Sequence, residues 1–227
     1  MIRFRRVSFS YGGPPVLSGA DLHVESGLTL LVGPNGCGKS TLLKLAAGVE
    51  RPDSGSIEIM GRDLWTDEVS ARRELAYVPE QPDLTPYATI EDIIHLVCRL
   101  RAEPLVKGRE ALEKAGLGPV AKRSIRELSM GQRRRAVLAA AWIGSPRVVL
   151  LDEPLEAMDR GMRQGILSWV ERLLSESAAV IAATHDIEPF VSCAVRALTV
   201  VNAACYLHPL NDELGKMAVL EQLSTNA

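Results

Sequence analysis

The order of apolar and polar residues along the chain predicts strands and helices that alternate. Residues 2–9 alternate between the two classes, which is typical of a half-buried strand, and we expect this strand at a sheet edge. The same reading predicts further strands in 16–32 (two runs), 56–59 and 76–78, and helices at 39–48 and 67–75.

The pattern changes near residue 88. Helix-forming residues with a period of 3.6 predict one helix from Ile90 to Leu100 and a second at about 105–115. We therefore expect a mainly helical insertion over residues 82–135. The chain is then a single domain over 1–227, with an α/β core formed by 1–81 and 136–210 and a weakly amphipathic tail over 211–227.

Two wholly apolar runs follow the insertion. Residues 148–151 and 178–183 contain only Val, Leu, Ile and Ala, as expected for strands buried on both faces of a parallel sheet. A helix is expected between them, at 160–175, and a terminal hairpin around Asn202 and Ala203. These elements favour an α/β fold.

Composition narrows the possible partners. The net charge of −2 and the isoelectric point near 6.1 provide no general attraction for nucleic acid or anionic lipid. We interpret the basic run Arg133–Arg135 as a solvated helix face. The four cysteines lack metal-type spacing, which favours a reducing, cytosolic setting. With neither a signal-like start nor an apolar run near 18 residues, a soluble protein is expected.

Residues 33–41 carry the strongest chemical signal. They read GPNGCGKST and fit the phosphate-binding pattern G-x-x-x-x-G-K-[ST], after a strand-like run and before a helical one. Glycines let backbone N–H groups turn inward, and the following helix adds its positive end. Lys39 is expected to reach the outer phosphates and Ser40 to bind Mg²⁺, so the motif predicts a nucleoside triphosphate site.

Two acidic residues follow the apolar run 148–151. Because ligands lie beyond the carboxyl ends of parallel strands, Asp152 and Glu153 are expected to face the site. Asp152 would then hold Mg²⁺ and Glu153 would polarise the attacking water. The alternative is that both residues only end the strand and begin the turn before Pro154.

Three other features are ambiguous when taken singly. Ser129 is a good N-cap for a helix expected to begin near Arg133, and that motif alone is more often structural. His185 ends a strand-like run, where a lone histidine is also more often structural. Tyr11 could stack on a base or fill a sheet edge.

Taken in order, the motifs of this chain resemble those of the nucleotide-binding subunit of ABC transporters. The likeness runs from about residue 2 to 207 and is carried by Tyr11, 33–41, Glu80–Gln81, 128–132, 150–153, Asp159 and His185. It implies a P-loop NTPase core with an antiparallel β edge subdomain and a helical insertion. It also implies a Mg²⁺-dependent ATPase with Glu153 and His185 as catalytic residues.

The resemblance also assigns the nucleotide contacts. It implies that Tyr11 stacks on adenine and that the phosphates lie on the loop comprising Gly33, Pro34, Asn35, Gly36, Cys37, Gly38, Lys39, Ser40 and Thr41. Two subunits, alike or different, would pair so that the signature motif of one, with Ser129, Gly131 and Gln132, covers ATP held by the other. Asp159 resembles the D-loop aspartate. Glu80 or Gln81 would reach the metal and water, and their register is open.

The partner implied by the resemblance is a separate transmembrane permease, which places the subunit in the cytoplasm at the inner face of the membrane. A non-transport ATPase, for example of iron–sulfur assembly, remains an alternative; a small-molecule kinase or a non-hydrolysing module fits the motifs less well. The cargo stays open, and residues 77–82 favour export only mildly. Cys37, at a helix start, is expected to be reactive or simply to fill a small slot.

Overall fold

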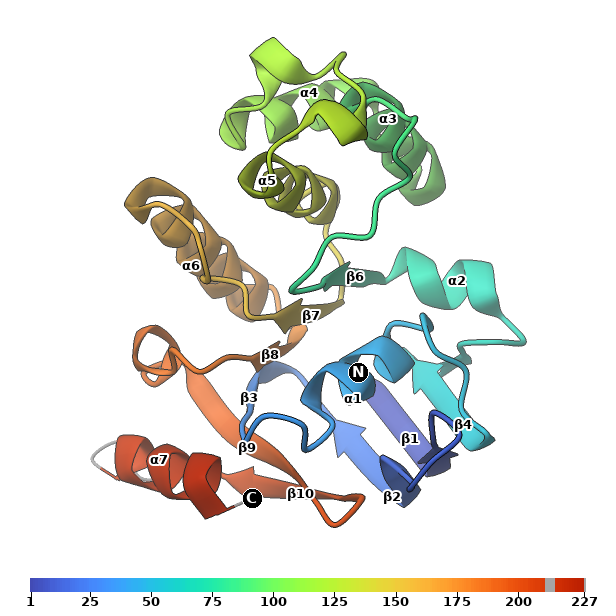
Figure 1. Cartoon of the computed structure of the whole chain (residues 1–227), viewed down its shortest axis with the longest axis vertical. Helices are drawn as coiled ribbons and strands as arrows, with labels where there is room; N and C mark the ends of the chain where they lie inside the picture. The colour runs from blue at the N-terminus through green and yellow to red at the C-terminus, as the bar shows by residue number, and fades with distance from the viewer. Residues whose placement is uncertain (211–214, 227) are drawn as a thin grey trace.

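The computed structural model describes residues 1–210 and 215–226 and contains two β-sheets (Figure 1). The larger sheet has the strand order β10-β9-β3-β8-β7-β6, and only β10 runs antiparallel to its neighbour. Its strands are β3 (Gly27–Leu31), β6 (Leu75–Val78), β7 (Val148–Asp152), β8 (Ala179–Ala183), β9 (Ala194–Val201) and β10 (Ala204–Pro209). The hairpin expected around Asn202 and Ala203 is therefore confirmed.

The smaller sheet is antiparallel and corrects one expectation. Its order is β2-β1-β4-β5, formed by β1 (Ile2–Phe9), β2 (Leu17–Val24), β4 (Ser54–Ile59) and β5 (Arg62–Asp63). The strand at 2–9 is thus internal, and its expected place at a sheet edge is wrong. Alternation shows only that one face is buried, whereas Ile2 has partners on both sides, Val24 and Ile59.

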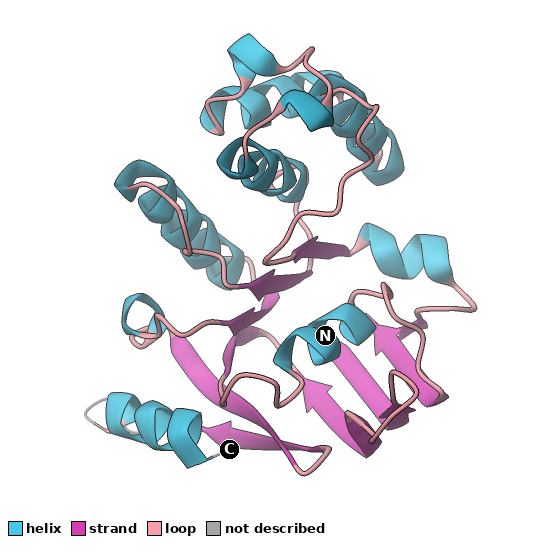
Figure 2. Cartoon of the chain, in the orientation of Figure 1, coloured by secondary structure: helices cyan, strands magenta, loops and turns pink. Residues whose placement is uncertain are grey.

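The longer helices are α1 (Lys39–Ala46), α2 (Glu68–Arg73), α3 (Ile90–Arg101), α4 (Leu105–Lys114), α5 (Met130–Ala141), α6 (Arg160–Ser175) and α7 (Lys216–Asn226). Helices α1, α2, α3, α4 and α6 lie in segments that the sequence predicts to be helical, whereas α7 lies in the tail, for which the sequence shows only a weak amphipathic pattern. Short 3₁₀ turns are η1 (Gly118–Val120), η2 (Ile125–Glu127) and η3 (Glu188–Phe190). Helices α3, α4 and α5 gather at one end of the molecule, away from the antiparallel sheet (Figures 1 and 2).

The start of one helix differs from the sequence expectation. Helix α5 begins at Met130 rather than near Arg133, because Ser129, the residue immediately before Met130, is its N-cap. The limit expected for the helical insertion, residue 135, therefore lies inside α5, and the subdomain division remains a prediction. Part of the expected C-terminal tail, residues 211–214, lies outside the described residues.

The parallel sheet is buried on both faces, as the apolar runs predict. Along β7, Val149 and Leu151 join a cluster with α3, α5 and α6, whereas Val148 and Leu150 join a second cluster with α1 and the antiparallel sheet. All five residues of β7 are buried. This double layer holds the carboxyl ends of β7 and β8 rigidly beside the start of α1.

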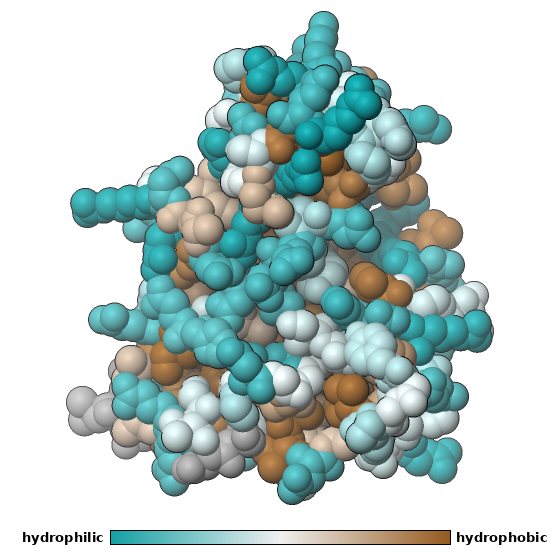
Figure 3. Space-filling view, viewed as in Figure 1, coloured by the Kyte–Doolittle hydropathy of each residue, from teal (hydrophilic) through white to brown (hydrophobic). Residues whose placement is uncertain are grey.

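The face drawn in Figure 3 is largely hydrophilic, and its apolar atoms lie in small separate patches. In the described residues, we find no helix whose length and apolarity would let it cross a bilayer.

Candidate functional site

A cavity of about 930 Å³ opens at the carboxyl edge of the parallel sheet. The loop before α1 and the ends of β7 and β8 surround it, so three chain segments far apart in sequence meet there. Eleven of the residues predicted from the sequence line it: Tyr11, Asn35, Gly36, Gly38, Lys39, Ser40, Thr41, Glu80, Asp152, Glu153 and His185.

The loop before α1 has the backbone shape that phosphate binding needs. Gly38 adopts φ +109°, and a Cβ there would lie 2.8 Å from the Val16 side chain, so both conformation and space require glycine. Helix α1 begins at Lys39 without a side-chain cap. Its first N–H groups therefore have no partner inside the helix and can donate to an anion.

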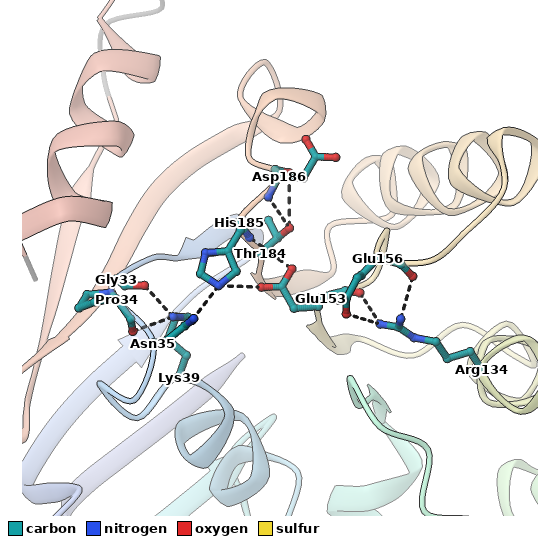
Figure 4. Close-up of polar contacts among 10 residues, drawn as sticks. All are labelled: Gly33, Pro34, Asn35, Lys39, Arg134, Glu153, Glu156, Thr184, His185 and Asp186. Carbon is teal, nitrogen blue, oxygen red and sulfur yellow. Dashed lines mark hydrogen bonds and ion pairs between the residues drawn. The ribbon is translucent and has the colours of Figure 1, made fainter. Parts of the chain in front are cut away.

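Lys39 places its charge at this loop. The side chain is buried, and its Nζ donates to the carbonyl oxygens of Gly33 at 2.6 Å and Pro34 at 3.0 Å (Figure 4). The ammonium is thus held by groups that a phosphate can replace. Cys37 is half-buried and packs against the second core cluster, which agrees with a side chain that fills a small slot.

Asp152 lies at the end of β7 beside Ser40. Burial raises the pKa of the Asp152 carboxyl above its ordinary value, and a hydrogen bond with Ser40 partly offsets this effect. One carboxylate and one hydroxyl are a suitable protein contribution for Mg²⁺, which usually keeps several waters and phosphate oxygens as ligands. Among the described residues, no group of three or more His, Cys, Asp or Glu side chains could hold a metal by itself.

Glu153 is held in a specific conformation. Its φ is +47°, a left-handed value that is uncommon outside glycine, and its N–H donates to Ala183 O at 2.8 Å. Its carboxylate accepts the N–H of His185 at 3.3 Å and lies 3.6 Å from the ring Nε2. Burial raises the pKa of Glu153, and the His185 N–H partly offsets the rise. Such a carboxylate suits the role of general base.

His185 joins the two sides of the cavity. Its Nε2 is 3.0 Å from Asn35 Oδ1 in the phosphate loop and also faces Glu153 (Figure 4). The imidazole is exposed to the cavity and therefore accessible to a ligand. The position of His185 at the end of β8 thus brings it to the same point as Glu153.

The structure also separates two candidates that the sequence left open. Of the pair after Pro79, Glu80 lines the cavity, whereas Gln81 is not among the lining residues of the described chain.

Tyr11 is 59% exposed at the rim of the cavity, and its ring and that of Phe9 form a T-shaped pair with a centroid distance of 4.8 Å. Most of the ring is therefore accessible at the rim of the cavity, which suits a stacking residue.

The signature residues lie elsewhere in this chain. Ser129 Oγ accepts the N–H of Gln132 at 3.2 Å, and Gln132 Oε1 accepts the N–H of Ser129 at 3.0 Å, while Gly131 is exposed. Asp159 caps α6 by accepting the N–H of Met162. In the described structure, these four predicted contacts are capped helix starts outside the cavity of their own chain.

Sequence reasoning missed several residues of the cavity. Thr184 and Asp186 flank His185, and Arg163 of α6 lines the cavity and forms an ion pair with Asp186. Thr184 Oγ1 accepts the N–H of Asp186 at 3.1 Å. The polar residues on either side of His185 at a strand end were a usable signal, whereas Arg163 had none because its partner is distant in sequence.

The basic run 133–135 was misinterpreted. Arg134 is buried, 7% exposed, and the guanidinium groups of Arg133 and Arg135 donate to backbone carbonyls, so the expected solvated helix face is wrong. One helix turn holds about 3.6 residues, so three consecutive residues cannot all lie on one face. The central arginine consequently points inward.

Comparison with known proteins places these features in a family. The family described as "ABC transporter" matches residues 17–156. The chain is 40% identical over 187 residues to the Fe(3+) ions import ATP-binding protein FbpC 1 of Rhodococcus jostii, covering 79% of this chain and 54% of that protein. It is 39% identical over 193 residues to the sulfate/thiosulfate import ATP-binding protein CysA of Synechococcus elongatus, covering 82% and 56%.

A third relative, the spermidine/putrescine import ATP-binding protein PotA of Spiroplasma citri, is 33% identical over 210 residues, or 90% of this chain and 60% of that protein. The chain thus spans little more than half the length of the curated relatives it matches. Among solved structures, an ATP-binding subunit of an ABC transporter superimposes with a TM-score of 0.84 at 22% identity, covering 97% and 94% of the two chains. A dimeric bacterial ABC transporter cassette gives 0.79 at 23% identity, covering 93% and 100%.

Proposed function

The chain belongs to the ABC transporter family of ATP-binding proteins, with the ABC ATPase fold, and from this we propose that it binds MgATP and hydrolyses it to drive import through a separate transmembrane permease. The observation that carries the proposal is the convergence of Lys39, Asp152 and Glu153 on one cavity beside an uncapped helix start. These are, respectively, a phosphate-binding cation, a metal-binding carboxylate and a candidate base.

Nucleotide binding would use groups that are already in place. The ammonium of Lys39 exchanges its two loop carbonyls for phosphate oxygens, and the first N–H groups of α1 donate to the same anion. Tyr11 at the rim is available to stack on the base. Ser40 and Asp152 would hold Mg²⁺, which when bound neutralises charge on the phosphates.

Hydrolysis would depend on Glu153. Its carboxylate, whose pKa is raised by burial, orients a water and accepts its proton as the water attacks the γ-phosphate. The imidazole of His185, in contact with both Glu153 and Asn35, is placed to donate to the γ-phosphate once that group fills the cavity. Glu80 lines the same cavity and would contact the metal or its bound waters.

A second cassette would complete the site. Ser129, Gly131 and Gln132 lie at the start of α5, where Ser129 and Gly131 are exposed and the helix end carries partial positive charge. These residues do not line the cavity of their own chain, so the triphosphate bound by a partner is the ligand that this helix start would contact. Asp159, at the start of α6, would lie at the same interface. A similar fold occurs in the dimeric cassette, in which two such subunits are paired.

The names of the relatives support a proposal for the direction of transport. Three named relatives are import ATP-binding proteins, which favours import over the mild lean to export suggested by residues 77–82. They are named for ferric, sulfate or polyamine cargo, and this spread leaves the cargo of the present chain open. We place the subunit in the cytoplasm at the inner face of the membrane, bound to its permease and not to nucleic acid.

The test is ATP turnover by the purified chain with Mg²⁺, alone and with the permease it co-purifies with. We expect hydrolysis that Glu153→Gln lowers by about 10²–10⁴-fold while ATP-dependent dimers accumulate, measured by phosphate release and by light scattering. Failure of the wild-type chain to bind MgATP would overturn the proposal.

A further inference from the structure

A buried arginine from α5 reaches the backbone of the Glu153 segment. Arg134 donates through Nη2 to Glu153 O at 2.8 Å and through Nη1 to Glu156 O at 2.8 Å. Figure 4 shows Glu153 between two neighbours, with His185 on one side and Arg134 on the other. The two ends of one guanidinium therefore set the separation of two carbonyls three residues apart.

The environment of Arg134 is unusual for a structural cation. The side chain is 9% exposed, and its ion-pair partner, Glu156, whose carboxylate lies at 3.5 Å, has a side chain that is 58% exposed. Burying a guanidinium is unfavourable unless its N–H groups find acceptors, and here backbone carbonyls supply them. Its planar fork suits two fixed acceptors better than a flexible lysine does.

The carbonyl that Arg134 binds belongs to a residue with a disfavoured backbone. Glu153 has φ +47°, and such conformations persist at functional sites only where the surroundings impose them. The N–H of Glu153 is held by Ala183 O, and its carbonyl is held by Arg134 and by the N–H of Glu156 at 3.2 Å. Arg134 is thus the one side chain that ties this peptide unit to α5 within the described contacts.

We propose that Arg134 is a positioning residue, which orients the Glu153 carboxylate for attack and couples the position of α5 to hydrolysis. The inference rests on the proposed function. Ser129, the residue that would meet the partner's triphosphate, is the N-cap of α5, and Arg134 lies little more than one turn further along the helix. A shift of α5 when that triphosphate binds would therefore reach the Glu153 peptide through a single side chain.

A purely structural brace makes a different prediction. Arg101 is such a brace, since its guanidinium donates to the carbonyls of Leu75, Ala140, Ala141 and Ile143, all outside the cavity. Arg133 is the matched control next to Arg134, because it carries the same charge on the same helix and binds the carbonyls of Ile125 and Arg126. Replacing Arg101 or Arg133 should therefore change the stability of the protein without changing the turnover of each folded molecule.

The experiment compares Arg134→Met, Arg134→Lys and Arg133→Met with the wild type. We expect Arg134→Met to lower kcat about 10- to 100-fold, since small displacements of a reacting group have effects of that order. KM and Kd for MgATP should stay unchanged, Arg134→Lys should recover part of kcat, and Arg133→Met should keep it. Amide hydrogen exchange over residues 153–158 should rise in Arg134→Met only.

Wild-type kcat in Arg134→Met, or equal losses of kcat in the Arg134 and Arg133 variants, would overturn the inference. If Arg134→Met does not fold, Arg134→Lys decides, because unchanged kcat and unchanged exchange in that variant refute a positioning role. A wild-type chain without ATPase activity would count against the proposed function instead. The exchange comparison still tests Arg134 in that case.

Discussion

Replacing Lys39 by methionine should remove most of the affinity for the β- and γ-phosphates. Methionine keeps the length and the apolar packing of the buried stem but lacks the ammonium that meets Gly33 O at 2.6 Å and Pro34 O at 3.0 Å. In the proposed MgATP complex this ammonium would contact phosphate oxygens instead. The substitution therefore isolates one charge at one place.

The magnitude follows from the bonds exchanged. A hydrogen bond to a charged group contributes about 1.5–3 kcal/mol, which corresponds to roughly a 10- to 150-fold change in Kd. The wild-type ammonium gives up two carbonyl bonds when it binds phosphate, so part of this gain is offset. We expect weakening of about 10-fold for ADP and about 100-fold for ATP, which carries the additional γ-phosphate charge.

The assay is titration calorimetry of wild type and Lys39→Met with MgATP, MgADP and AMP. Lys44→Met is the control, because Lys44 lies on the same helix, carries the same charge and does not line the cavity. AMP affinity should change little in either variant. The reasoning is refuted if Lys39→Met binds MgATP within twofold of wild type, or if Lys44→Met weakens ATP and ADP binding equally.

Three other changes test the site and the fold. Glu153→Gln should lower kcat by about 10²–10⁴-fold in a phosphate-release assay with Kd for MgATP retained, and an unchanged kcat would remove Glu153 from the mechanism. Burial raises the pKa of Asp152 in the folded protein above its value in the unfolded chain. The folded state therefore loses stability as the pH rises from the unfolded pKa to the folded pKa, because the buried carboxyl becomes charged. Asp152→Asn should therefore raise the Tm of the nucleotide-free protein at about pH 7, and the gain should vanish below about pH 4, where the unfolded carboxyl is also protonated; calorimetry that shows no gain at neutral pH contradicts this. Gly108→Ala should destabilise the fold, because the added Cβ would lie 2.6 Å from Ile94 Cγ2 and 2.9 Å from Cys98 Sγ. Overpacking costs about 1–3 kcal/mol, which exceeds the gain in helix propensity of about 1 kcal/mol, and urea unfolding measures the difference.

Short stretches of sequence determined several local features of this protein. The phosphate loop, the apolar strand before Asp152 and Glu153, and the cap at Ser129 are each written in a few adjacent residues, because backbone conformation and capping depend on near neighbours. The position of Asp152 and Glu153 at the cavity could also be predicted, since the carboxyl ends of parallel strands share one edge of the sheet.

Long-range packing decided the rest. The internal place of the strand at 2–9 depends on two partners distant in the chain, Val24 and Ile59. The choice of Glu80 over Gln81 at the cavity depends on how the loop after β6 leaves the sheet. Arg134 looked like part of a solvated basic run, and only the packing of α5 against the Glu153 turn buries it. The exposure of a side chain depends on its neighbours in space, so the residues adjacent to Arg134 in the sequence could not show that it is buried.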